Sequence, residues 1–166
     1  GLTEAQPENN VQRIVLEMLA VTLSKDARAR AVQLPAWNEA LGLPRPWDQQ
    51  WSLRIQQVLA YETDVTKTVD PFAGSYVVES LTDDLEEEAL DLMRQVAERG
   101  GAVAAIEQGF QKSEIERSAY RIANEIDDGE RVVVGVNKFT VETEEHYEPL
   151  RVNPAIEAEQ AERLAM

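Results

Sequence analysis

The chain has 166 residues, of which 43% are hydrophobic and 28% charged, so its length and composition fit one soluble globular domain with a real core. Its 31 acidic and 16 basic residues leave a net charge of −15, which excludes a general affinity for nucleic acid phosphates or anionic lipid. There is no cysteine, which excludes disulfides and thiolate metal sites and favours a reducing, cytoplasmic location.

The first 62 residues predict two long helices with a mixed segment between them. Residues 1–10 are polar and predict a loop, and the apolar residues of 11–22 then recur at helical spacing. Residues 28–34 are a candidate strand, and residues 35–43 a candidate short helix. The second long helix is expected over 47–62, with an apolar stripe formed by Trp51, Ile55, Val58 and Leu59.

The block Val69–Thr82 predicts a turn that leads into a helix. Pro71 fixes its own backbone and keeps Asp70 out of the helical region, while Gly74 tolerates angles that other residues avoid. Residues 76–78 are aromatic and β-branched, so we expect an extended piece there. Ser80-x-x-Asp83 has the spacing of a capping box and predicts where the following helix begins.

The second half of the chain is predicted to be mainly helical. A helix with one apolar face is expected to end at Gly100–Gly101, followed by a short helix over 102–108 and another over 115–126. A polar helix closes the chain at 155–165. The apolar face of the first of these helices consists of Leu85, Ala89, Leu92, Met93 and Val96.

Strands are expected at few places. The run 131–136 predicts a short buried strand, and 150–152 a second one. We therefore predict a fold class that is mostly α with minor β. A complete α/β barrel is excluded, because it needs eight strands and about 250 residues.

Four blocks of sequence resemble the large-chain family of adenosylcobalamin-dependent acyl-CoA mutases, whose best-known member is methylmalonyl-CoA mutase. They occur in the order and at the approximate spacing that the family shows. They are Gln6–Asn10, Asn38–Pro44, Val69–Thr82 and Gly135–Lys138. Residues 33–51 look like the ethylmalonyl-CoA mutase branch, whereas residues 70–76 look more like the methylmalonyl branch.

The resemblance implies a place within a larger plan. In this family an α/β barrel holds the acyl-CoA along its axis, a separate cobalamin domain caps the barrel, and an adenosyl radical starts a carbon-skeleton rearrangement. Residues 1–80 correspond to the final units of the α/β (TIM) barrel. Residues 81–166 correspond to the helical segment that leads toward the cobalamin domain and includes the expected strand at 131–136.

The resemblance also implies a cofactor-binding residue. Glu39 occupies the position whose acidic residue contacts the ribose of the adenosyl group, and a carboxylate suits two hydroxyl donors. The alternative is that Glu39 is an acid in the first turn of a short helix, favoured by the helix dipole. Gln33 and Arg30 are further candidates for cofactor binding, at the end of the candidate strand.

Other family features are missing or altered. Methylmalonyl-type members carry Gln-Ser-Leu-His-Thr-Asn at the position of residues 30–35, and here Gln33 and Pro35 replace the histidine and asparagine. The Asp-x-His-x-x-Gly cobalt-ligand motif is absent, since His146 is the one histidine and lies in an acidic run of unsuitable spacing for a metal. Asn9 and Asn10 are expected to cap the first helix.

We therefore expect no mutase activity from the chain alone, which we interpret as part of a longer enzyme. The expected partners are an acyl-CoA substrate, the remaining barrel and cobalamin domain, and a second subunit in a homo- or heterodimer. Neither nucleic acid nor a membrane is expected. The alternatives are a self-standing helical binding or regulatory module and an inactive subunit derived from a mutase; the retained Glu39 weighs against an inactive subunit.

Overall fold

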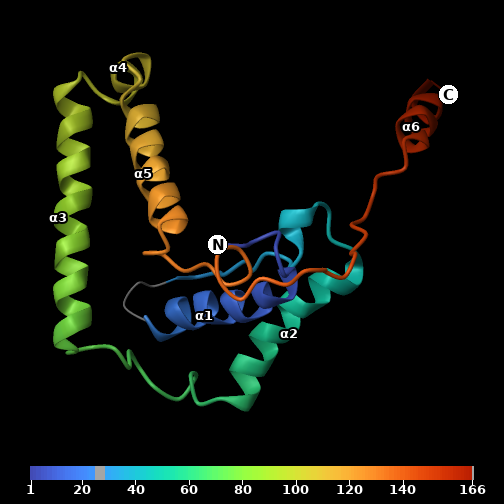
Figure 1. Ribbon diagram of the computed structural model, residues 1–166, viewed down its shortest axis with the longest axis horizontal. Helices are drawn as coiled ribbons and strands as arrows, with labels where there is room; N and C mark the ends of the chain where they lie inside the picture. The colour runs from blue at the N-terminus through green and yellow to red at the C-terminus, as the bar shows by residue number, and fades with distance from the viewer. Residues whose placement is uncertain (25–28, 166) are drawn as a thin grey trace. The chain divides into compact units, whose positions relative to one another are not determined.

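The computed structural model describes residues 1–24 and 29–165 (Figure 1). By its internal contacts the chain forms two compact units. The first unit combines residues 1–70 with the C-terminal residues from 142 onward, and the second unit is Pro71–Val141.

The first unit is built on two long helices. A 3₁₀ turn, η1 (Pro7–Asn9), leads into α1 (Asn10–Leu23), and a second 3₁₀ turn, η3 (Glu39–Leu41), precedes α2 (Pro46–Glu62). Pro46 lies in the first turn of α2, where the missing N–H costs nothing. The unit also includes α6 (Ala155–Ala165), which has no buried residue.

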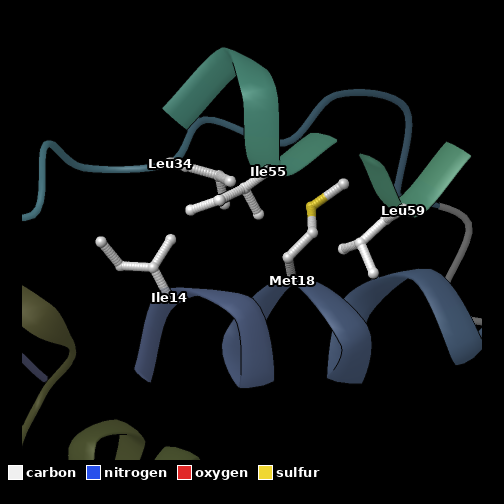
Figure 2. Packing of buried hydrophobic residues seen from close by; sticks show 5 residues of the cluster. All are labelled: Ile14, Met18, Leu34, Ile55 and Leu59. Carbon is white, nitrogen blue, oxygen red and sulfur yellow. The ribbon is translucent and has the colours of Figure 1, made fainter. Parts of the chain in front are cut away.

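The hydrophobic core of the first unit lies between α1 and α2. Figure 2 shows Ile14 and Met18 of α1 facing Ile55 and Leu59 of α2, with Leu34 from the connecting segment completing the cluster. Fully burying side chains of this size stabilises a fold by about 1.5–3 kcal/mol each. Trp51 and Val58, predicted as core members, are instead each 44% exposed, and Asp48 and Ser52 share the buried face of α2.

The second unit is a run of three helices. It contains α3 (Tyr76–Glu98), α4 (Ala102–Glu107) and α5 (Phe110–Asp127), with α4 at the turn between the two long helices (Figure 1). Gly100 and Gly101 end α3 with φ values of 94° and 96°, in the region that favours glycine. The guanidinium carbon of Arg99 lies 3.9 Å from the centre of the Phe110 ring, which joins the end of α3 to the start of α5.

The predicted long helices, the short helix after Gly101 and the C-terminal helix are confirmed, and the described chain is mostly helical. The candidate helix at 35–43 is limited to the three-residue 3₁₀ turn η3. The predicted strands are wrong. Within the described residues the β structure consists of two isolated bridges, Val134 with Lys138 and Leu43 with Leu150. Residue 28 lies outside the described residues, and residues 29–34 form no regular element. The described residues contain no barrel.

The run 131–136 turns back on itself instead of extending. Gly135 has φ 87°, and the amide of Asn137 accepts from Val133 N–H at 2.7 Å and donates to the carbonyl of Arg131 at 2.8 Å. Asn137 also donates to the carbonyl of Ile126 at 2.7 Å, close to the end of α5. These bonds satisfy the backbone locally, so the apolar run needs no partner strand. Asn137 therefore has a structural role in this turn.

The start of α3 also differs from the prediction. The turn at Asp70 and Gly74 is confirmed, with φ values of 44° and 76°. The helix begins at Tyr76, because the Ser75 hydroxyl accepts from Val78 N–H at 3.5 Å. Residues 76–78 are therefore helical, and Ser80 and Asp83 lie inside the helix. The β-propensity of three residues is too small to override a well-capped helix start.

No helix among the described residues has the length and apolar character needed to span a membrane.

Candidate functional site

The turn that carries Glu39 is tied to both long helices of the first unit. The Ser52 hydroxyl of α2 donates to the carbonyl oxygen of Pro35 at 2.7 Å. The Asn10 amide of α1 donates to the carbonyl oxygen of Trp37 at 2.9 Å. Both side chains are buried, so the backbone on the N-terminal side of Glu39 is held at two points.

Glu39 is the first residue of η3, and its side chain is exposed. One carboxylate oxygen, Oε2, accepts from Ala36 N–H at 3.2 Å. A carboxylate has about four lone-pair positions, so a single backbone bond orients the group and leaves most of its acceptor capacity unused. The geometry fits a ligand that presents two hydroxyl donors.

Arg30 and Gln33 lie on the irregular segment that precedes this turn, and both are exposed. Among the described residues, no hydrogen bond or ion pair joins either side chain to Glu39. The three predicted cofactor-binding residues are therefore near one another in sequence, and the structure does not bring their side chains into contact. Their role in binding stays a prediction.

A buried carboxylate lies directly after the turn. Asp48, in the first turn of α2, is fully buried and accepts from Arg45 N–H at 2.8 Å and from Arg45 Nε at 3.2 Å. The Tyr147 hydroxyl donates to the same carboxylate oxygen. Tyr147 also lies under the Arg45 guanidinium, at 4.4 Å from ring centre to Cζ, and edge-on to Trp37 at 5.2 Å.

The charge state of Asp48 follows from these contacts. Burial alone raises its pKa, but the bonds from Arg45 and Tyr147 outweigh burial and hold the pKa well below its usual range. Asp48 is therefore ionised at neutral pH. It ties the start of α2 to residue 147, which is 99 positions away in the chain.

We expect the phenol of Tyr147 to ionise above its ordinary pKa range. Burial, followed by its hydrogen bond to Asp48, raises the pKa of its phenol. Because the folded pKa lies above the unfolded value of about 10, the stability due to the phenol is complete below that pH and is lost as the pH rises through the folded pKa. An ultraviolet titration of the chain and of Tyr147→Phe tests this.

The titration has a clear alternative outcome. If Tyr147→Phe leaves the high-pH end of the titration unchanged, the hydrogen bond from Tyr147 to Asp48 does not form in solution.

Asn38 is the unsatisfied polar group of this region. Its side chain is 1% exposed and lies beside Asp48, yet neither amide atom makes a hydrogen bond of good geometry within the described part of the chain. Buried amides are nearly always paired with protein or ordered water. The Asn38 amide therefore keeps donor and acceptor capacity that the described residues do not satisfy.

Sequence reasoning missed Asn10, Ser52 and Tyr147. Asn10 is not a helix cap, because its amide bonds Thr3, Arg13 and Trp37. Asn9 makes no cap bond either; its amide donates to Gln6 at 3.2 Å. No local signal marks Ser52 or Tyr147. The spacing of Arg45 and Asp48 was the one available clue, because an acid three residues inside a helix start is typical of a capping box.

Metal binding has no structural support among the residues described. No group of three acidic or histidine side chains there has a suitable arrangement. His146 lies in an exposed stretch.

The chain is similar to known acyl-CoA mutases. A family model for methylmalonyl-CoA mutase matches residues 1–166. Ethylmalonyl-CoA mutase of Methylorubrum extorquens is 60% identical over 139 residues, which is 84% of this chain and 20% of that protein. Methylmalonyl-CoA mutase of Escherichia coli is 39% identical over 153 residues, which is 92% of this chain and 21% of that protein.

A third relative is named as a large subunit. The methylmalonyl-CoA mutase large subunit of Porphyromonas gingivalis is 38% identical over 165 residues, which is 99% of this chain and 23% of that protein. The chain thus spans about a fifth of the length of the relatives that it matches. Identity is higher with the ethylmalonyl-CoA mutase than with the two methylmalonyl-CoA mutases.

Proposed function

The chain belongs to the methylmalonyl-CoA mutase family, and we propose that it is a segment of an adenosylcobalamin-dependent acyl-CoA mutase of the ethylmalonyl branch. Such an enzyme isomerises a branched acyl-CoA, in the manner of the conversion of methylmalonyl-CoA to succinyl-CoA. The observation that carries the proposal is the match over the whole chain, with 60% identity to an ethylmalonyl-CoA mutase.

The proposed role of this segment is to bind part of the cofactor. Glu39 accepts hydrogen bonds from the two ribose hydroxyls of the adenosyl group, and Gln33 and Arg30 add polar contacts from the preceding segment. The exposed Glu39 carboxylate, with one oxygen oriented by Ala36 N–H, supports this. When bound, adenosylcobalamin supplies the radical that starts the rearrangement.

The rest of the proposed enzyme lies outside this chain. Residues 1–80 are proposed as the final units of an α/β barrel and residues 81–166 as the segment leading to a cobalamin domain. The chain has no Asp-x-His-x-x-Gly motif and spans about a fifth of its relatives, which supports inactivity in isolation. A cytoplasmic location and assembly as a homo- or heterodimer complete the proposal; the name of the Porphyromonas relative supports a partner subunit.

An assay of the full-length protein tests the function. With adenosylcobalamin, kcat/KM is expected to be highest for ethylmalonyl-CoA, lower for methylmalonyl-CoA and lowest for isobutyryl-CoA. The 166-residue chain in the same assay is expected to give no turnover. Preference for methylmalonyl-CoA would contradict the branch, and a lack of cobalamin-dependent turnover with all three thioesters would contradict the function itself.

A further inference from the structure

We infer that Ser52 and Asn10 are positioning residues for Glu39: they clamp the turn 35–39 between α2 and α1 and so fix the direction of the Glu39 carboxylate. The inference rests on the proposed cofactor role of Glu39. The two clamping bonds come from different helices and reach carbonyl groups two residues apart, at Pro35 and Trp37.

The Ser52 bond is placed to control the turn. Ser52 is 4% exposed and lies on α2 between Asp48 and Ile55, on the buried face of the helix. Its hydroxyl satisfies a carbonyl that belongs to no regular element. If the hydroxyl is removed, that carbonyl loses its partner in a partly buried position, and the turn is expected to shift to regain one.

The Asn10 bond holds the other side of the same turn. Asn10 is fully buried, and its Nδ2 divides its two N–H donors between the carbonyls of Trp37 and Thr3, both at 2.9 Å. Its Oδ1 accepts from Thr3 N–H at 3.0 Å and from Arg13 at 2.7 Å. All the capacity of this amide is used, so Asn10 has one fixed orientation.

The clamp matters because Glu39 has little other support. Among the described residues its side chain makes one bond, to Ala36 N–H, and that donor lies between the two clamped carbonyls. A shift of the backbone at 35–37 therefore moves the group that orients the carboxylate. A binding residue on an exposed turn gains affinity when its backbone is preorganised by buried neighbours.

The first experiment measures, without any cofactor, how strongly the two hydrogen bonds restrain the turn. Amide hydrogen exchange of residues 36–42 is followed in the 166-residue chain, in Ser52→Ala and in Asn10→Asp, which keeps Oδ1 and loses both donors. Both variants are expected to speed exchange in this segment about three- to tenfold. The control is Thr82→Ala, which removes an exposed hydroxyl that donates to the Val78 carbonyl at 2.7 Å within α3. Unchanged exchange at 36–42 in both clamp variants overturns the inference.

The second experiment uses the full-length protein with adenosylcobalamin. Ser52→Ala is expected to raise the apparent Kd of the cofactor about three- to tenfold, with kcat retained at saturating cofactor. The double variant with Glu39→Gln is expected to bind no more weakly than Glu39→Gln alone, because both changes act through one contact. If the two substitutions together raise the Kd by the product of their separate effects, Ser52 acts independently of the Glu39 contact, and the inference is overturned.

The outcomes separate the inference from the proposed function. If the wild-type protein shows no cobalamin-dependent turnover, the mutase proposal is wrong. The exchange measurement still tests whether Ser52 and Asn10 hold the turn in place. If the wild-type protein is active and Glu39→Gln binds the cofactor with unchanged affinity, Ser52 and Asn10 are not positioning residues for cofactor binding. The mutase proposal is unaffected by that result.

Discussion

Replacing Asp48 by alanine is expected to lower the free energy of unfolding of the first unit by about 2–4 kcal/mol. The carboxylate is fully buried and accepts three bonds from Arg45 and one from Tyr147. Its removal leaves a backbone N–H at the helix start and a phenol without an acceptor. Arg45 is half exposed and regains water, which keeps the loss below that of a wholly buried ion pair.

Tryptophan fluorescence during urea unfolding of the 166-residue chain measures this change. All three tryptophans lie between residues 37 and 51, so the signal reports the first unit alone. The matched control is Asp64→Ala, which breaks an ion pair with Lys67 at 2.8 Å whose side chains are more than 70% exposed. That control is expected to change stability by less than about 1 kcal/mol. Equal effects from the two variants would mean that Asp48 is not buried in solution.

The pH dependence of the first unit follows from the same carboxylate. Because the folded pKa of Asp48 is lowered, its contribution is present above the unfolded value of about 4 and is lost as the pH falls through the folded pKa. The free energy of unfolding of the first unit is therefore expected to depend less on pH in the acid range in Asp48→Asn, because asparagine cannot ionise. A variant that keeps the full acid dependence would assign it to other carboxylates.

Helices were predictable because their signals are local and repeated. The spacing of Ile14 and Met18 predicts α1, and the same two residues pack against Ile55 and Leu59 in the core. Gly100 and Gly101 predict where α3 ends. Each of these elements satisfies its backbone internally, so its prediction does not depend on distant parts of the chain.

Strands were not predictable, because a strand needs a partner that the segment itself does not supply. The run 131–136 has strand composition, but Asn137 bonds its backbone and Gly135 turns it. Leu150 makes one bridge to Leu43, and no second bridge extends it among the described residues. Composition identifies an apolar run, but it does not determine which other segment would pair with that run as a strand.

At the candidate site, only the exposed binding residue could be predicted from the sequence. Glu39 was found through its family resemblance. The buried Asn10 and Ser52 and the half-buried Tyr147 act through contacts across 27, 17 and 99 positions of sequence. An asparagine after a polar loop and a serine on a helix have common local interpretations, and those interpretations hide a role that depends on tertiary packing.

In the full-length protein, Glu39→Ala is expected to weaken adenosylcobalamin binding by about 2–3 kcal/mol, or roughly 30- to 150-fold. The carboxylate is proposed to accept two hydroxyl bonds, and hydrogen bonds to a charged acceptor are stronger than neutral ones. Because the Glu39 side chain is exposed and regains water when unbound, the loss is expected to be smaller than two fully buried bonds of this kind would give. A cofactor titration measures the change, with Glu39→Gln expected to lie between the wild-type protein and the alanine variant.

Glu8→Ala separates ribose binding from a simple helix-dipole role for Glu39. Glu8 is also an exposed acid in the first turn of a three-residue 3₁₀ helix, η1, so a dipole role predicts similar small effects for both substitutions. Ribose binding predicts weaker cofactor binding for Glu39→Ala alone, with the unfolding midpoint of the first unit nearly unchanged in both variants. If both acids prove equally dispensable for cofactor affinity, Glu39 is a helix-start acid, and the ribose contact must come from another part of the enzyme.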